Sequence, residues 1–118
     1  MADAGLFIGW GQVVRGREQR ALEVFNESVE YWAGLQSDGK VEDFEIVLLA
    51  PHGGDLQGYA ILRGSAEQLN ALRDDDEFQR RNTRADQIVE GFGVIDAALG
   101  EGIGRAMNIY TEEIQALG

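Results

Sequence analysis

The sequence predicts an α+β fold in which one antiparallel sheet is built from the element order β-α-β-β-α-β, with a further helix at the C-terminal end. Three observations support this fold class. Apolar, β-branched runs alternate with segments whose apolar residues recur every three or four positions, and a Gly-Gly loop joins the two central runs. The length of 118 residues, with no Pro- or Ser-rich interruption, indicates that residues 1–118 form a single domain.

The first strand and the first helix are predicted from the N-terminal third of the chain. Residues 6–13 (LFIGWGQV) are apolar, aromatic and β-branched and lie shortly before Gly16, which is typical of a strand. Residues 17–36 are predicted to form a long helix with one face towards the core, because their apolar residues recur at steps of three and four. These residues are Leu22, Phe25, Val29, Trp32 and Leu35.

The second and third strands are predicted to form a hairpin. Turn residues at 37–40 (SDGK) precede the second strand at residues 41–50 (VEDFEIVLLA). Residues 51–55 (PHGGD) interrupt this run, and residues 56–63 (LQGYAILR) resume it as the third strand. A short glycine-containing loop between two such runs favours antiparallel pairing.

Two helices are predicted to follow the hairpin. Ser65 and Gln68 have the spacing of a capping box at the start of a short helix. The acidic residues 74–76 are expected to begin a second helix, because negative charge stabilises a helix N-terminus. The expected buried side chains are Leu69 and Leu72 in the first helix, and Phe78, Ala85, Ile88 and Val89 in the second.

The C-terminal quarter is predicted to contain a fourth strand and a last helix. Residues 92–99 (FGVIDAAL) have the composition of a strand, and residues 100–104 (GEGIG) are expected to form a flexible entry to the helix. This glycine segment lacks the lysine and the Ser or Thr of a phosphate-binding loop. The helix has one apolar stripe, formed by Ile103, Met107, Tyr110, Ile114 and Leu117.

Composition excludes several functional classes. The net charge of −11 would repel polyanions, so we expect neither a nucleic-acid partner nor a membrane partner. The absence of cysteine excludes disulfides, thiolate catalysis and cysteine-held metal centres. Residues 1–5 (MADAG) do not have the pattern of a secretion signal, and no run approaches the roughly 18 apolar residues of a membrane span, so we expect a cytoplasmic protein.

The element order predicts the ferredoxin-like arrangement, a four-stranded antiparallel sheet with its helices on one face. If Phe44, Ile46 and Leu48 meet the helices, alternation places Val47 and Leu49 on the opposite face, beside the Tyr59 and Ile61 of the next strand. An apolar surface of that extent usually marks an interface. We therefore expect a homodimer in which two sheets face each other.

The element order and the hairpin at residues 44–64 (FEIVLLAPHGGDLQGYAILRG) resemble the dimeric α+β barrel superfamily over residues 6–99. That superfamily includes antibiotic-biosynthesis-type monooxygenases and many small proteins of unknown function. The resemblance implies a cavity beside the sheet, which in relatives holds an aromatic or polyketide-like substrate, haem or no known ligand. Because the single histidine, His52, lies in a predicted loop, the chain departs from the haem-binding members, and no cofactor is expected.

Candidate catalytic residues are His52, Tyr59 and Arg63. His52 is the one side chain whose ordinary pKa lies near neutrality, which suits general acid or base chemistry. Tyr59 and Arg63 share a strand face and would donate hydrogen bonds to a substrate oxygen. The alternatives are that His52 bonds the backbone of its own loop and that Arg63 pairs with a carboxylate on a neighbouring strand.

Candidate ligand-binding residues are Trp10, Glu45, Phe92 and Asp96. The two carboxylates lie within apolar strands and would accept a proton or a hydrogen bond, and the two aromatic rings would line the cavity. The alternatives are that the carboxylates form ion pairs and that Trp10 belongs to the core. No metal site is expected, because consecutive acidic residues such as 74–77 point in different directions on a helix.

Half of the positive charge lies between positions 63 and 84, in Arg63, Arg73, Arg80, Arg81 and Arg84. An anion pocket is one interpretation. The alternative is a solvated helix face held by i,i+4 pairs, of which the sequence offers Asp76 with Arg80 and Glu77 with Arg81.

These observations favour a small homodimeric protein that binds an apolar or aromatic molecule in a cavity beside the sheet. A catalytic alternative is a cofactor-independent monooxygenase or isomerase of an aromatic or polyketide-like substrate. A third alternative is a non-catalytic assembly protein that uses the open sheet face for dimerisation alone.

Overall fold

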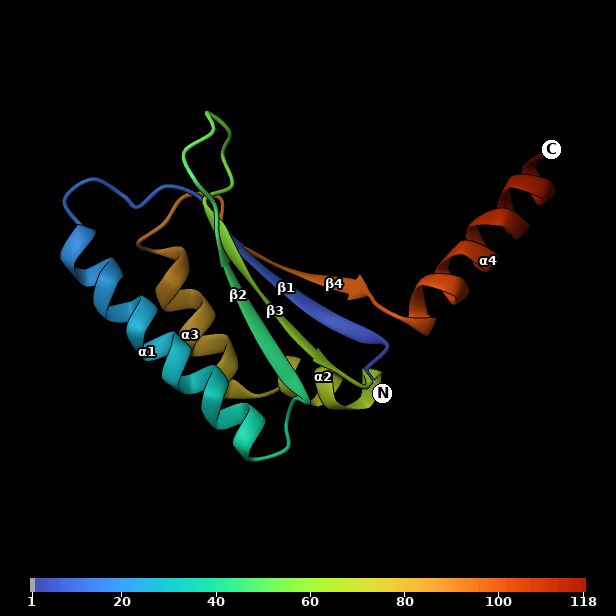
Figure 1. Ribbon diagram of the computed structural model, residues 1–118, viewed down its shortest axis with the longest axis horizontal. Coiled ribbons are helices and arrows are strands. Elements are labelled where there is room, and N and C mark those ends of the chain that lie inside the picture. The colour runs from blue at the N-terminus through green and yellow to red at the C-terminus, as the bar shows by residue number, and fades with distance from the viewer. Residues whose placement is uncertain (1) are drawn as a thin grey trace.

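The computed structural model describes residues 2–118 and has the predicted element order (Figure 1). The elements are β1 (Ala4–Trp10), α1 (Glu18–Ser37), β2 (Asp43–Leu48), β3 (Gly58–Gly64), α2 (Ala66–Arg73), α3 (Asp76–Asp86), β4 (Gly93–Ala98) and α4 (Glu101–Leu117). Each strand is one to four residues shorter than predicted, because terminal residues such as Leu49, Leu56 and Leu99 lie in loops, and β1 begins at Ala4, two residues earlier than expected.

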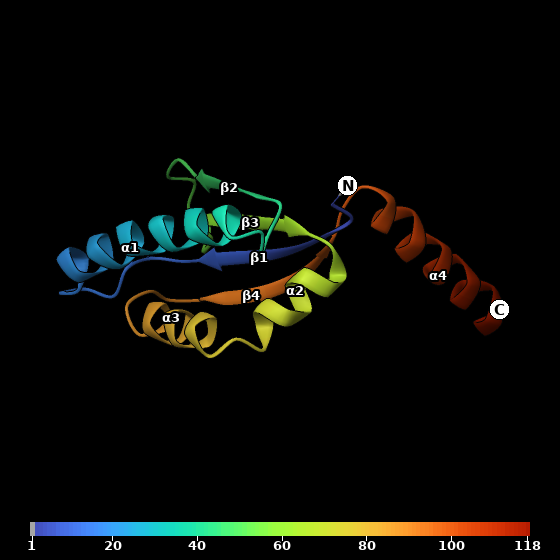
Figure 2. The same ribbon diagram turned by 90° about the horizontal axis from the view of Figure 1, so that it is seen from below.

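The four strands form one antiparallel sheet in the order β2-β3-β1-β4. This is the order of the ferredoxin-like fold, so the predicted fold class is confirmed. Helices α1, α2 and α3 lie on one side of the sheet, while α4 projects away from it (Figures 1 and 2).

The main core lies between the sheet and these three helices. Leu6 faces Leu62 across β1 and β3, and Ile8 faces Ala60 in the same register; all four side chains are buried. The helices cover them with Trp32, Leu35, Leu69, Leu72 and Phe78, and Phe44 and Ile46 of β2 pack against the same cluster. The face of β2 that was expected to meet the helices therefore does so.

Local hydrogen bonds fix where α2 and α3 begin. The Ser65 hydroxyl accepts from the Gln68 backbone N–H at 3.1 Å, and the Gln68 side chain accepts from the Ser65 N–H at 2.8 Å, which completes the predicted capping box. Gln68 also donates to the Gly39 carbonyl at 3.0 Å and so ties α2 to the α1–β2 turn. The Asp75 carboxylate caps α3 by accepting from the Phe78 N–H at 3.1 Å.

The second face of the sheet, here called the open face, carries apolar side chains with no helix of α1–α3 over it. It includes Phe7, Val47, Tyr59, Ile61 and Ile95, and the Phe7 and Tyr59 rings stack with centroids 4.8 Å apart. Ile95 is exposed. The placement of Val47, Tyr59 and Ile61 on one face agrees with the alternation expected from the sequence.

The structure corrects one expectation about the C-terminal segment. Glycines 102 and 104 do not form a flexible entry, because α4 already begins at Glu101. Only Gly100 lies outside the helix, as its N-cap. Within residues 2–118 no helix combines the length and the hydropathy needed to cross a bilayer.

Replacing Ser65 with alanine should lower the free energy of unfolding by about 0.5–2 kcal/mol, because the N-terminus of α2 loses its capping acceptor. Ser65→Asp is the matched control and should retain most of the stability. Urea unfolding at one fixed protein concentration measures both variants. Equal losses in the two variants would show that the cap is not the source of the effect.

Candidate ligand-binding site

A cavity of about 420 Å³ lies between α1, the C-terminal end of α3 and the helix-covered face of the sheet. Aromatic rings dominate its wall: Trp10, Phe25, Trp32 and Phe92. The aliphatic lining consists of Ile8, Val13, Ala21, Leu22, Val24, Leu48, Ala85, Ile88 and Val89. Both tryptophans of the chain therefore contact this space.

The cavity exists because the buried side chains form two separate clusters. Ile8 and Trp32 belong to the main core, whereas Ala21, Val24 and Ile88 form a smaller cluster between α1 and the segment after α3. Residues of both clusters line the cavity. Trp10 bridges part of the space through an edge contact with Phe25, with centroids 6.1 Å apart.

The two hydrophilic side chains of the lining, Glu18 and Ser28, bond to backbone groups nearby. Glu18 accepts a hydrogen bond from the Gly16 N–H at 2.9 Å, and the Ser28 hydroxyl donates to the Val24 carbonyl at 2.7 Å. A ligand in the cavity would therefore meet apolar surface and aromatic faces. The exposed rim residues Val13, Leu22 and Leu48 leave the cavity open to solvent.

Of the sequence-predicted site residues, Trp10 and Phe92 line the cavity. Arg63 does not, because it lies on the open face and forms ion pairs with Glu45 at 2.8 Å and Asp43 at 3.3 Å. The hydrogen bond to Glu45, followed by that to Asp43, raises the pKa of the Arg63 guanidinium. Tyr59 lies on the same face and stacks on Phe7.

His52 lies in the exposed loop between β2 and β3. Its Nδ1 accepts from the Gly54 N–H at 3.1 Å, and its Nε2 lies 2.7 Å from the Leu56 carbonyl oxygen. Both ring nitrogens are thus engaged by the backbone of the loop when Nε2 carries the proton. The hollow beside this loop, about 670 Å³, is polar, and its wall includes Asp55 and Glu90.

Asp96 lies on exposed surface and pairs with Arg73 of α2 at 2.9 Å. The structure therefore does not bring His52, Tyr59 and Arg63 together with Trp10 and Phe92 in one site. The two carboxylates singled out in the strands, Glu45 and Asp96, each bond an arginine.

Several cavity residues were not predicted as site residues, because their apolar spacing is also that of core side chains. Phe25 and Trp32 lie on the predicted apolar stripe of α1, and Ile88 and Val89 were expected on the buried side of the second helix. The one available signal was the density of aromatic residues on that stripe, with two large rings within eight positions.

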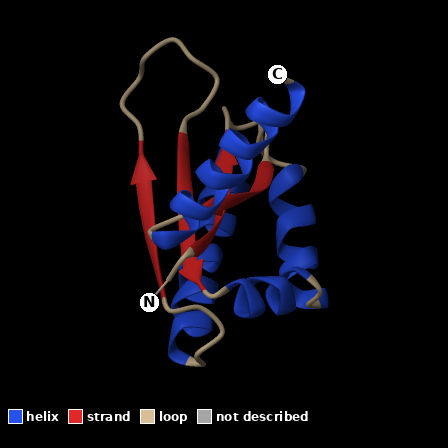
Figure 3. Cartoon of the chain, turned by 90° about the vertical axis from the view of Figure 1, so that its right-hand side faces the viewer, coloured by secondary structure: helices blue, strands red, loops and turns tan. Residues whose placement is uncertain are grey.

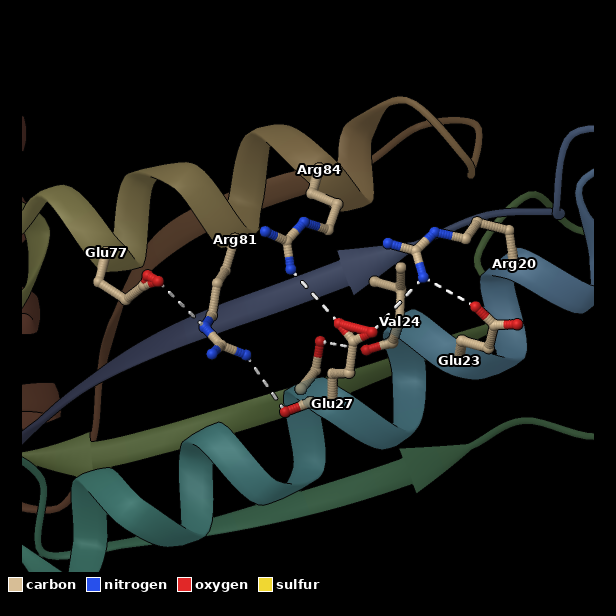
Figure 4. A network of polar contacts seen from close by, with 8 residues as sticks. Arg20, Glu23, Val24, Glu27, Glu77, Arg81 and Arg84 are labelled. Carbon is tan, nitrogen blue, oxygen red and sulfur yellow. Dashed lines mark hydrogen bonds and ion pairs between the residues drawn. The ribbon is translucent and has the colours of Figure 1, made fainter.

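Arg81 and Arg84 of α3 form a paired surface with α1 (Figure 4). Arg84 pairs with Glu27 at 3.3 Å, and Arg20 contacts Glu23 at 2.8 Å and Glu27 at 3.5 Å. Arg81 lies 3.8 Å from Glu77, the i,i+4 partner expected from the sequence. These contacts favour the paired helix face over an anion pocket.

Tyr31 and Arg81 form a second contact between α1 and α3. The Arg81 guanidinium lies 4.3 Å from the centroid of the Tyr31 ring. The Tyr31 hydroxyl is buried and has no hydrogen-bond partner among the described residues. Burial, reinforced by the charge of Asp75, raises the pKa of Tyr31 to about 12, although Arg81 opposes the shift.

Within residues 2–118, no three histidine or acidic side chains gather in a way that could hold a metal ion. The candidate site is the apolar cavity, whose lining can bind and orient a hydrophobic molecule but offers one titratable side chain, Glu18.

Comparisons with known proteins support the fold. No family model matches the sequence, and neither does any curated protein. A dimeric protein of unknown function with a ferredoxin-like fold from Bacteroides fragilis superposes with a TM-score of 0.60 at 12% identity, covering 81% of this chain and 96% of that one. A putative antibiotic biosynthesis monooxygenase from Chloroflexus aurantiacus has a TM-score of 0.52 at 13% identity, with coverages of 82% and 93%.

The chain thus has the fold that its resemblance to the dimeric α+β barrel superfamily implied. At these identities the likeness concerns the fold, and function depends on the site.

In Tyr31→Phe, the free energy of unfolding should fall less steeply with pH than in the wild type between pH 10 and about 12. The raised pKa favours the neutral phenol in the folded chain. The contribution of this raised pKa to the free energy of unfolding is fully present below the ordinary tyrosine pKa of 10.0. It is lost as the pH rises through the folded-state pKa of about 12. Urea unfolding across this range tests the difference, and parallel curves would contradict it.

Proposed function

We propose that the protein binds a small apolar or aromatic molecule in the cavity between α1, α3 and the sheet, and that it does so as a homodimer. The observation that carries the proposal is the cavity itself, about 420 Å³ in volume and lined by four aromatic rings. Ligand sites typically measure about 300–1,000 Å³ and are lined mainly by apolar and aromatic side chains.

The chemistry of the lining limits the ligand class. Trp10, Trp32 and Phe92 present ring faces and edges that suit offset or edge-to-face contact with another aromatic system. Since the lining is otherwise aliphatic and aromatic, a strongly polar ligand would lose most of its hydrogen bonds to water without replacement. The best fit is a molecule with one or two rings and few polar atoms.

The catalytic alternative, oxygenation or isomerisation of an aromatic substrate without a cofactor, would use the same cavity. The monooxygenase-like fold of the Chloroflexus aurantiacus protein is compatible with it. However, the residues expected to orient the substrate, His52, Tyr59 and Arg63, lie outside the cavity. The geometry therefore supports binding better than acid–base catalysis, and it favours both over a protein used for assembly alone.

The proposed homodimer packs through the open face. Val47, Tyr59 and Ile95 present apolar surface there, and an uncovered apolar sheet face is a typical interface. The Bacteroides fragilis protein of similar fold is described as dimeric. The proposed location is the cytoplasm. The chain has no cysteines and so no disulfides, as is usual for proteins of that reducing compartment.

A neutral probe, N-phenyl-1-naphthylamine, should bind the cavity and accept excitation energy from the tryptophans, because both tryptophans of the chain lie in the wall. Ala85→Phe should weaken binding by at least about ten-fold, since the new ring occupies ligand space. Ala33→Phe, on the exposed side of α1, is the matched control and should bind like the wild type. Circular dichroism confirms that both variants fold.

Equal affinities in the Ala85→Phe and Ala33→Phe variants would place the probe elsewhere and reject the cavity as the binding site. Native purification followed by mass spectrometry then identifies any molecule that the wild-type cavity retains and the Ala85→Phe cavity does not.

Ile95→Glu should convert the dimer to a monomer at micromolar concentration in sedimentation velocity, because a charge on the open face would be buried at the interface. Leu48→Glu is the control. Both residues lie on edge strands, and Leu48 is 67% exposed and Ile95 57% exposed. They differ in the face of the sheet, because Ile95 lies on the open face and Leu48 on the face that the helices cover. Dissociation in both variants, or in neither, would contradict a dimer through the open face.

A further inference from the structure

Helix α4 has an apolar stripe that nothing in the described chain covers. Its 17 residues include Ile103, Met107, Tyr110, Ile114 and Leu117, spaced so that all five share one side of the helix. All five side chains are exposed, and no residue of α4 is buried. A helix of this length is only marginally stable in water by itself, so its stripe requires a surface to pack against.

The start of α4 is held in a defined direction. Gly100 has a φ of +50°, which favours glycine, and the chain turns there from β4 into the helix. At Gly102 the backbone lies against the Asp3 carbonyl so closely that a Cβ would clash with its oxygen. The Leu99 N–H donates to the same carbonyl at 3.1 Å. The helix is therefore anchored beside the first residues of β1 and projects as an arm.

The arm stands on the side of the sheet that carries the open face. Figure 1 shows α1 and α3 on one side of the strands and α4 on the other, and Figure 3 shows α4 in front of the strands when the molecule is viewed from that other side. A second chain that packs on the open face would therefore come next to α4.

The area of the open face gives a second argument. Four strands of six or seven residues cover only roughly 400 Å² in projection, since strands lie about 4.8 Å apart and rise about 3.3 Å per residue. Stable specific interfaces bury about 800 Å² on each partner. A helix of 17 residues is about 25 Å long, so its stripe adds a substantial share of the missing area.

Charge disfavours an anionic lipid surface as the occupant of the stripe. The polar side of α4 carries Glu101, Glu112 and Glu113 against the single Arg105, and the whole chain has a net charge of −11. Helices that bind anionic membranes in their interfacial plane have basic polar faces, so a lipid surface does not fit.

We propose that α4 is an exchanged arm that packs its apolar stripe on a second copy of this chain, continuous with the contact between the open sheet faces. Twofold symmetry makes the contact twice, one arm from each subunit. This inference rests on the proposed dimer through the open face and adds a second interface to it.

The experiment compares two isoleucines of the same helix in the full chain. Ile114 and Ile109 are 54% and 53% exposed, but Ile109 lies about 120° around the helix from the centre of the stripe. Ile114→Glu should raise the dissociation constant of the dimer at least about ten-fold in sedimentation velocity, whereas Ile109→Glu should stay within about two-fold of the wild type. Hydrogen exchange of the α4 amides should be slow in the wild-type dimer and fast in Ile114→Glu.

The outcomes separate the arm from the dimer itself. If Ile114→Glu dimerises like the wild type while Ile95→Glu is monomeric, the proposed exchange of α4 is rejected and the dimer through the open face is retained. If Ile114→Glu dissociates the dimer and Ile95→Glu does not, the exchange of α4 is retained and the open-face contact is rejected. A monomeric wild type with protected α4 amides would overturn both proposals in favour of a helix folded onto its own sheet. Binding of the wild type, but not of Ile114→Glu, to phosphatidylserine vesicles would overturn the arm in favour of a membrane contact.

Discussion

The alternation of side chains along the two central strands constrains most of this structure. β1 and β3 are apolar at nearly every position, so burying one side of the sheet cannot remove all of their apolar side chains from water. Leu6, Ile8 and Leu62 are sealed by α1, α2 and α3. Phe7, Tyr59 and Ile61 point the other way; Phe7 and Tyr59 stack on each other and stay partly exposed, whereas Ile61 is buried. The proposed dimer and the proposed role of α4 both follow from this surplus of apolar surface.

The same constraint explains the location of the cavity. Helices α1 and α3 cover the sheet with two separate clusters of buried side chains, and Trp10 lies at the end of β1 where the clusters diverge. The two helices are also joined by the ion pair of Arg84 with Glu27 and by the contact of Arg81 with the Tyr31 ring. A space lined by rings remains between them, and its mainly apolar lining suits a hydrophobic molecule.

Local sequence patterns were sufficient to predict the elements and the faces of the strands, because these depend on neighbours a few positions apart. The Ser65 and Gln68 capping box and the placement of Val47 with Tyr59 and Ile61 are examples. Local patterns did not predict which residues come together in one site. Tyr59 and Trp10 lie on opposite faces because Trp10 pairs with Gly58, a register that only the assembled sheet defines. Glu45 and Arg63 were predicted to be site residues because they are polar residues in apolar strands. In the structure they form an ion pair with each other across β2 and β3.

In the proposed assembly, two copies of the chain together cover the surfaces that one copy leaves apolar, while each keeps a hydrophobic cavity. Native mass spectrometry of the 118-residue chain reports assembly and retained ligand in one spectrum. We expect a species of twice the 13.0 kDa chain mass, with bound small molecules that leave on collisional activation. A spectrum of ligand-free monomer at micromolar concentration would contradict this proposal.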